Sequence, residues 1–202
     1  VKINYRVFGQ TKENSNTILN SFLFKKIIKS IIIGTIPIVF LGGIIKLFIP
    51  DFFDNILRSN LSIAIISLLM AIYMYFADVS KNKFINIRNH KYLDSLLIGF
   101  SQSFSIIPGV SRSGVTISTA LLSGWDRRDA AKYSFLLGIP AISLAAIVEL
   151  IFSINQLSDF KFFPILVGLF TAFLSSLLSI KFFLKFLSSH GLKLFSYYRV
   201  IF

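Results

Sequence analysis

Four long apolar segments constrain this chain more than any other feature of its sequence. They cover residues 27–49, 61–77, 133–154 and 163–184. Each is close to the roughly 20 residues that a helix needs to cross the hydrocarbon core of a bilayer. Charged residues make up only 15% of the chain, whereas an ordinary soluble domain carries charge on about a quarter of its residues. The sequence therefore predicts an all-α integral membrane protein, folded as one multi-span helical bundle, and excludes a soluble enzyme and a disordered chain.

The charges between these segments predict the orientation of the protein. The net charge is +12, but the basic residues fall in short clusters between apolar runs, so no basic face remains to bind nucleic acid. Such clusters occupy residues 2–26, 81–91 and 127–132, whereas the loop at 50–58 holds two aspartates against one arginine. Because short basic loops stay on the cytoplasmic side, we expect a multi-pass membrane protein with the three basic clusters inside.

A fifth apolar stretch, residues 95–124, has a different character. It is too long for one span and too short for two, and a proline–glycine pair interrupts it. If it crossed once, the basic clusters on either side would lie on opposite faces of the membrane, against the positive-inside rule. We therefore expect a re-entrant helix–loop–helix hairpin over 92–123, with arms at 92–107 and 113–123 and its tip at 108–114. Non-helical backbone at membrane depth is tolerated only where other parts of the protein bury it or where it lines a water-filled cavity. We therefore expect the tip to belong to a functional site.

The tip of this hairpin carries the chemistry that the sequence offers. Arg112 is the only formal charge between Asp94 and Asp126, and an ionisable residue at membrane depth is a functional candidate by default. Its planar fork of donors matches phosphate oxygens, and a helix N-terminus brings further N–H groups to an anion. A buried ion pair is the rival interpretation, but no acid lies nearby in the sequence. We predict a phosphate site led by Arg112, with catalytic hydroxyls at Ser111, Ser113 and Thr116 and substrate-binding glycines at Gly109 and Gly114.

The other polar residues give weaker signals. Gln102, roughly two helical turns before the tip, either hydrogen-bonds a phosphate as a substrate-binding residue or satisfies backbone groups at the break. His90 and His190 are expected to be solvated in basic loops. Arg127 is expected to be an orientation charge, and Glu149 to reach the membrane interface. With no cysteine and two distant histidines, no zinc site is expected.

Small residues and prolines within the spans carry structural expectations. Pro37 and Pro140 are expected to kink their helices rather than end them. Small side chains let membrane helices approach closely. We expect such packing at Gly34, Gly42, Gly43, Ser175, Ser176 and Ser179.

The run PGVSRSGVT, residues 108–116, resembles the signature Pro-Gly-x-Ser-Arg-Ser-x-x-Thr of the undecaprenyl-diphosphate phosphatase (bacitracin-resistance) family. The flanks GFSQSFSIIPG and GWDRRDAAKYSFLLGIPA are similar too, and the similarity extends from about residue 22 to the end. The resemblance implies half of an inverted-repeat architecture. It also implies hydrolysis of undecaprenyl diphosphate to undecaprenyl phosphate and inorganic phosphate, which recycles the lipid carrier of cell-wall synthesis and confers bacitracin resistance. The implied partners are a polyprenyl diphosphate lipid and membrane lipid, with a homodimer allowed.

A second signature of that family is absent from residues 1–27. It reads Glu-x-x-x-Glu and then Pro-x-Ser-Ser-x-x-His, on a re-entrant loop of its own. The final apolar run, 194–202, is too short to cross a membrane, so we expect the chain to be a fragment. The general base and a divalent cation, Mg or Ca, would then belong mainly to the missing motif. Two alternatives stay open: a polyprenyl-phosphate carrier or flippase, because transporters also hold anions at half-helix N-termini, and an inactive fragment.

Overall fold

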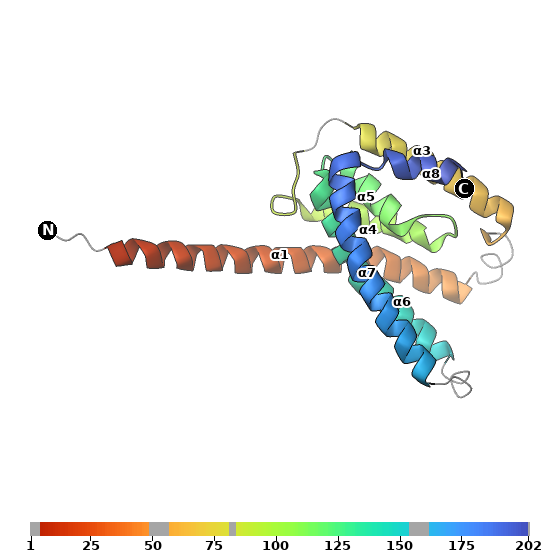
Figure 1. Ribbon diagram of the computed structural model, residues 1–202, viewed down its shortest axis with the longest axis horizontal. Coiled ribbons are helices and arrows are strands. Elements are labelled where there is room, and N and C mark those ends of the chain that lie inside the picture. Colours follow the sequence, from red (N-terminus) through yellow and green to blue (C-terminus); the bar gives the residue numbers. More distant parts are fainter. Residues whose placement is uncertain (1–4, 49–56, 81–83, 154–161, 202) are drawn as a thin grey trace.

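The computed structural model describes residues 5–48, 57–80, 84–153 and 162–201. Within these ranges the chain is helical (Figure 1), and the β pairing is limited to an isolated bridge between Ile85 and Trp125. The helices are α1 (Tyr5–Phe48), α3 (Asn60–Val79), α4 (Tyr92–Ser103), η2 (Phe104–Ile106, a 3-10 turn), α5 (Arg112–Leu122), α6 (Arg127–Ser153), α7 (Phe162–His190) and α8 (Lys193–Ile201). The prediction of an all-α protein is confirmed.

Four of the described helices are long and apolar enough to cross a membrane. They agree with the four apolar segments of the sequence and confirm a multi-pass membrane protein. Pro37 and Pro140 lie inside α1 and α6 without ending either helix. The candidate spans are Ser21–Ile45, Asn60–Val79, Arg127–Phe152 and Phe163–Leu187.

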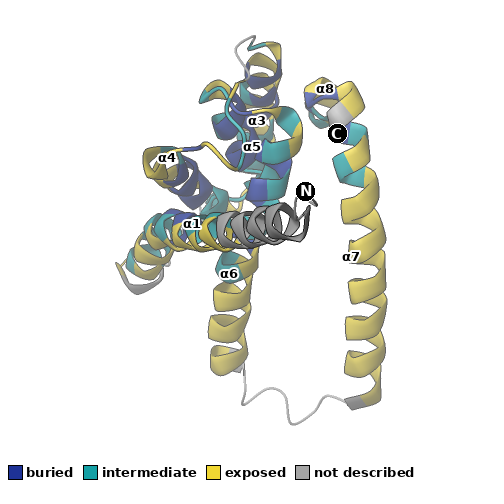
Figure 2. Ribbon diagram, turned by 90° about the vertical axis from the view of Figure 1, so that its left-hand side faces the viewer, coloured by how far each residue is buried: buried dark blue, intermediate teal, exposed yellow. Residues whose placement is uncertain are grey.

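The helices α6 and α7 project in the same direction from the rest of the molecule (Figure 1). Most of their large apolar side chains are exposed, and Figure 2 shows this along both projecting helices. Lipid tails are as apolar as leucine, so a bilayer solvates such a surface without penalty. The buried part of the protein is therefore concentrated at the other ends of these helices, around α5.

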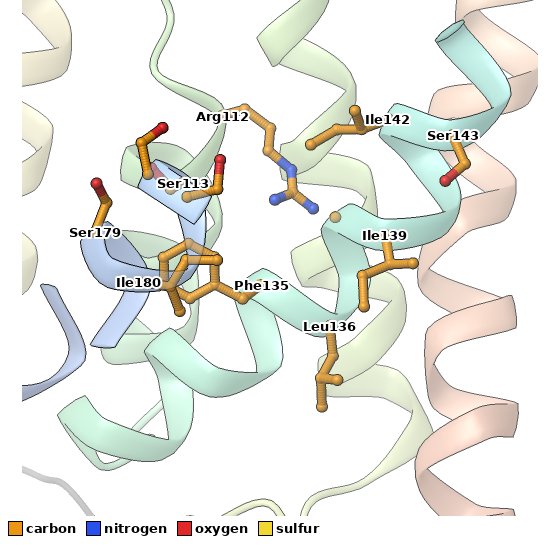
Figure 3. A pocket seen from close by; sticks show the side chains of 12 residues that line it. Arg112, Ser113, Phe135, Leu136, Ile139, Ile142, Ser143, Ser179 and Ile180 are labelled. Carbon is orange, nitrogen blue, oxygen red and sulfur yellow. The ribbon is translucent and has the colours of Figure 1, made fainter. Parts of the chain in front are cut away.

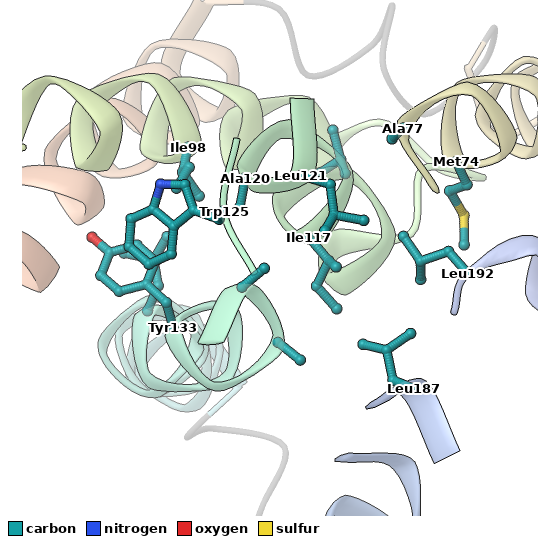
Figure 4. Packing of buried hydrophobic residues seen from close by; sticks show 14 of the residues in the cluster. Met74, Ala77, Ile98, Ile117, Ala120, Leu121, Trp125, Tyr133, Leu187 and Leu192 are labelled. Carbon is teal, nitrogen blue, oxygen red and sulfur yellow. The ribbon is translucent and has the colours of Figure 1, made fainter. Parts of the chain in front are cut away.

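The core lies where α5 packs against α3, α4 and α6. Ile117 and Leu121 of α5 are fully buried, and Trp125 and Tyr133 close the same cluster (Figure 4). The hydrophobic stripe of α5 thus holds its N-terminus, residue Arg112, at a defined depth in the molecule.

The chain breaks between α4 and α5 for local reasons. Pro108 has no N–H and disfavours a helical conformation at the preceding residue, and Ile107 is accordingly extended, with φ −73° and ψ 125°. Gly109 then takes φ +91°, a conformation that glycine adopts at low cost. The expected helix–loop–helix is present, although its first arm ends at Ser103 and continues as η2. Its re-entry into the bilayer stays a prediction.

Two glycines let α1 and α4 cross closely. A Cβ at Gly99 would overlap the backbone of Gly34, and a Cβ at Gly34 would come within 3.0 Å of the Ser95 carbonyl oxygen. The packing role expected for Gly34 is therefore confirmed. At Gly43 no atom of the described residues lies within 4 Å of where a Cβ would be, and at Gly42 the nearest lies at an ordinary 3.6 Å, so the described helices do not pack closely at these two glycines.

A half-buried ion pair joins the ends of α3 and α6, and its buried carboxylate also holds the start of α8. The Asp78 side chain is 1% exposed; its Oδ1 accepts a hydrogen bond from Arg127 Nε at 2.9 Å, and its Oδ2 accepts one from the Lys193 backbone N–H at 3.3 Å. Arg127 is thus a structural partner of Asp78. Its expected role as an orientation charge stays a prediction. The two charges lie 49 residues apart, so no local pattern could pair them.

His90 is buried, with 1% of its surface exposed, and the expectation that it is solvated is wrong. Its Nδ1 lies 2.8 Å from the Ile87 carbonyl oxygen, which can only accept, and its Nε2 lies 2.6 Å from Ser30 Oγ. The ring lies beside Trp125 and Tyr133. Burial lowers the pKa of His90, and of the charged neighbours Lys26 lowers it further while Asp94 opposes this. His190, in contrast, is exposed.

Labelling of introduced cysteines tests the hairpin. Because the chain contains no cysteine, a thiol reagent can label only the cysteine that each variant introduces. Asn89→Cys and Arg128→Cys should react with an impermeant maleimide from the same side of the membrane, and Arg58→Cys from the opposite side, as the loop charges require. Reaction of positions 89 and 128 from opposite sides would contradict re-entry.

The lowered pKa of His90 predicts acid sensitivity. When the pKa of a group is lower in the folded than in the unfolded protein, the unfolded state binds more protons, so stability falls as the pH decreases. The contribution is complete above about pH 6.5, the ordinary histidine value, and is lost below it. The midpoint of thermal unfolding should fall more between pH 7.5 and 5.5 in the unaltered protein than in His90→Gln. His190→Gln is the control and should keep the full pH dependence.

Candidate active site

The first turn of α5 is built by its own N-cap. Ser111 is extended, with φ −72° and ψ 116°, and its Oγ accepts a hydrogen bond from the Gly114 N–H at 3.1 Å. A serine at this position satisfies one of the donors that every helix leaves open at its start. Gly114 is required by space, because a Cβ there would lie 2.9 Å from the Cβ of Ser111 and 3.0 Å from Met74 Sδ. The sequence-predicted glycine and serine thus shape the turn from which Arg112 projects.

Gln102 holds the Arg112 guanidinium. Its Oε1 accepts hydrogen bonds from Arg112 Nε at 2.9 Å and from Nη2 at 2.7 Å. Gln102 is fully buried, and its Nε2 has no hydrogen-bond partner in the described part of the chain. This contact joins the two arms of the hairpin and fixes the direction of the guanidinium. The substrate-binding role expected for Gln102 stays a prediction.

Arg112 keeps donors for a ligand. Both N–H groups on its Nη1 lack a protein acceptor among residues 5–48, 57–80, 84–153 and 162–201, and no carboxylate within these ranges is close enough for an ion pair. The rival interpretation of a buried ion pair therefore finds no support there. A cation held by a neutral amide keeps its full charge for an anion, which favours phosphate.

Gly138 of α6 makes room for this guanidinium. A Cβ at Gly138 would overlap Arg112 Nη1, Nη2 and Cζ. Figure 3 shows the Arg112 side chain extending toward α6 at this level. Sequence reasoning did not single out Gly138, because a glycine within an apolar helix has many packing explanations and nothing near it in sequence points to Arg112.

Arg112 opens on a large, mostly apolar cavity between α5, α6 and α7, with a volume of about 720 Å³. Ser113 borders it beside the guanidinium (Figure 3). The serines expected to pack helices together instead line this cavity, so that expectation is wrong for Ser175, Ser176 and Ser179. Apart from Ser143 and Gly138, the remaining walls are apolar, from Phe135, Leu136, Ile139, Ile142 and Ile180.

The predicted hydroxyls have three different environments. Ser113 borders both the large cavity and a smaller one of about 190 Å³, which Ser111 also lines. Thr116 is fully buried; its Oγ1 donates to the Arg112 carbonyl oxygen at 2.9 Å and lies 2.7 Å from Ser134 Oγ. In this structure Thr116 supports the first turn of α5, whereas Ser113 is best placed to meet a ligand. The catalytic roles of these hydroxyls stay predictions.

Comparison with known proteins agrees with this geometry. The family model described as bacitracin resistance protein BacA matches residues 3–202. The chain belongs to the BacA family. This confirms the resemblance seen in the PGVSRSGVT run, which forms the tip of the hairpin and the first turn of α5.

Several relatives in the BacA family carry the name undecaprenyl-diphosphatase. The chain is 63% identical over 196 residues to that of Prochlorococcus marinus strain MIT 9515, covering 97% of this chain and 74% of the relative. It is 64% identical over 189 residues to that of Prochlorococcus marinus subsp. pastoris, covering 94% and 71%. The relative from Synechococcus sp. strain CC9311 is 41% identical over 173 residues, covering 86% and 61%.

Gly138→Ala tests the cavity geometry in this BacA protein. The added methyl should displace the guanidinium and weaken binding of inorganic pyrophosphate by about ten-fold or more, because charge-assisted hydrogen bonds are lost. Titration calorimetry on the purified protein measures the affinity. Gly168→Ala, where a Cβ meets nothing within 4 Å, should bind as the unaltered protein does. Equal affinity in both variants would contradict the placement of Arg112.

Proposed function

We propose that this protein hydrolyses undecaprenyl diphosphate. Water adds its oxygen to the terminal phosphorus, the bond from that phosphorus to the bridging oxygen breaks, and the products are inorganic phosphate and undecaprenyl phosphate. The reaction returns the lipid carrier of cell-wall synthesis to its monophosphate form.

One observation carries the proposal: the Arg112 guanidinium, held by Gln102, opens on an apolar cavity between helices that are able to span a membrane. The substrate has the same two parts, a charged diphosphate and a long hydrocarbon chain. The relatives named undecaprenyl-diphosphatase, at 61–64% identity, add independent support. No feature of the described residues favours the alternative of a carrier or flippase.

The described residues supply binding and charge neutralisation. In phosphoryl transfer most of the catalysis is positioning and stabilisation of charge on the transferred group. The fork of Arg112 fits two phosphate oxygens in one plane, and the N-terminus of α5 adds its dipole. Because Gln102 orients the guanidinium before the ligand arrives, little reorganisation accompanies the reaction, which is the condition for electrostatic catalysis.

Two described carboxylates, Asp78 and Asp129, and the His90 ring are engaged in contacts away from Arg112. Asp78 pairs with Arg127, Asp129 accepts from Lys132, and His90 bonds Ser30 and Ile87. Among the residues described, no three His, Cys, Asp or Glu side chains form a group able to hold a metal ion. The surroundings of Arg112 therefore do not fit a divalent cation, and Mg or Ca stays a proposal for acidic groups elsewhere in the protein.

Location and assembly follow as parts of the same proposal. The inner (plasma) membrane is where a lipid carrier of cell-wall precursors is used, and the basic loops suit its cytoplasmic face. A homodimer stays a prediction that follows from the family resemblance.

Phosphate release tests the proposed function. The protein, expressed from its complete gene and reconstituted in lipid, should release phosphate from undecaprenyl diphosphate and not from undecaprenyl phosphate. Arg112→Ala should lower kcat by about 10²–10³-fold, as expected when a preorganised donor is removed. Arg112→Lys should also be severely impaired, because lysine keeps the charge but loses the fork.

Arg128→Gln is the matched control for these variants. Arg128 is an exposed arginine of α6, and its removal should leave turnover unchanged. Equal turnover in Arg112→Ala and in the control would show that Arg112 has no part in the reaction. Absence of phosphate release from the unaltered protein would overturn the proposed function itself.

A further inference from the structure

A second arginine contacts the tip of the hairpin from the end of the chain. Arg199 lies in α8, and its Nη2 donates hydrogen bonds to the carbonyl oxygen of Gly109 and, at 3.2 Å, to Ser67 Oγ of α3. It also lines the smaller cavity of about 190 Å³ together with Ser111 and Ser113. Arg199 and the tip are 90 residues apart in the chain, so only the tertiary structure brings them together.

The carbonyl that Arg199 binds belongs to the residue on which the tip turns. Gly109 has φ +91°, and a Cβ there would lie 2.9 Å from the Ile63 carbonyl oxygen. The tip is therefore pressed against α3 on one side. A cation that holds the Gly109 carbonyl fixes the rotation of the peptide that follows, and with it the path of the chain into Ser111 and the first turn of α5.

Burying part of the Arg199 guanidinium costs free energy, which its contacts must offset. Its Nε is buried and has no hydrogen-bond partner within the described ranges. Buried donors without an acceptor are uncommon in folded proteins and need an explanation. Arg199 contributes to the docking of α8 through Ser67 of α3. The helix has other docking contacts as well, because the Tyr197 ring lies 6.2 Å from that of Tyr75 and the Lys193 N–H bonds Asp78.

We propose that Arg199 is a positioning residue of the active site, which holds the Gly109 carbonyl and thereby fixes the loop that presents Ser111 and Arg112. The inference rests on the proposed function for its kinetic consequence. The structural part of the inference is that Arg199 attaches the tip to α8, and this part does not depend on the proposed function. A mispositioned loop leaves the charge of Arg112 in place but moves it away from the transferred phosphate.

Kinetics of matched variants measure the consequence for the reaction. Arg199→Gln should lower kcat by about 10- to 100-fold with little change in KM, because small displacements of a preorganised group reduce the rate rather than the binding. Arg199→Lys should recover part of the rate, since lysine can still donate to the Gly109 carbonyl. Tyr197→Leu weakens the contact of α8 with α3 without touching the tip, and should keep most of the activity.

Accessibility of the tip gives a readout that does not need turnover. In a chain without cysteine, a Val110→Cys variant reports on the loop directly. Its reaction rate with a thiol reagent should rise when Arg199→Gln is added and stay unchanged when Tyr197→Leu is added. Equal rates in the two double variants, or equal kcat in Arg199→Gln and Tyr197→Leu, would overturn the inference. If the unaltered protein releases no phosphate but the labelling differs, the proposed function fails while the positioning role stands.

Discussion

Arg112 carries a full charge in a part of the chain that is otherwise apolar, and it is held there by the amide oxygen of Gln102 through two hydrogen bonds. An amide accepts these bonds without cancelling the charge, whereas a carboxylate would neutralise it. The rest of the site depends on this choice of partner. The break at Pro108 folds the two arms back so that the contact can form, and Gly138 leaves the space that the guanidinium occupies.

The buried core and the lipid-facing surface contribute differently to the site around Arg112. The buried cluster around Trp125 and Tyr133 anchors α5 at the level of the loops, while the exposed apolar faces of α6 and α7 need only lipid. The buried part of the described protein is thus small and adjacent to the charged tip. A substrate with a short charged head and a long apolar tail matches this division, since the head needs fixed donors and the tail needs only an apolar wall.

Two arginines approach the same turn from different elements. Arg112 extends from the start of α5 into the large cavity, and Arg199 reaches the tip from α8 beside the smaller cavity. Ser113 borders both. The two cations differ in their partners: Arg112 bonds a side-chain amide, whereas Arg199 bonds the backbone of the loop. This difference is why we assign ligand binding to Arg112 and positioning of the loop to Arg199 in our proposals.

The sequence by itself determined the membrane class, the four spans and the interrupted helix–loop–helix with Arg112 after its break. These follow from local hydropathy and from the conformations open to Pro108 and Gly109. The leading role of Arg112 in the site stays a prediction from the cost of a charge in an apolar stretch. The sequence did not determine which distant residues these side chains contact. The bonds of Arg112 to Gln102, of Arg127 to Asp78, and of Arg199 to the tip join residues 10, 49 and 90 positions apart, and the burial of His90 depends on aromatic rings from α6 and its flanking loop. Such contacts form only when helices pack, since a side chain in an unpacked helix has water or lipid, and no distant partner, within its reach.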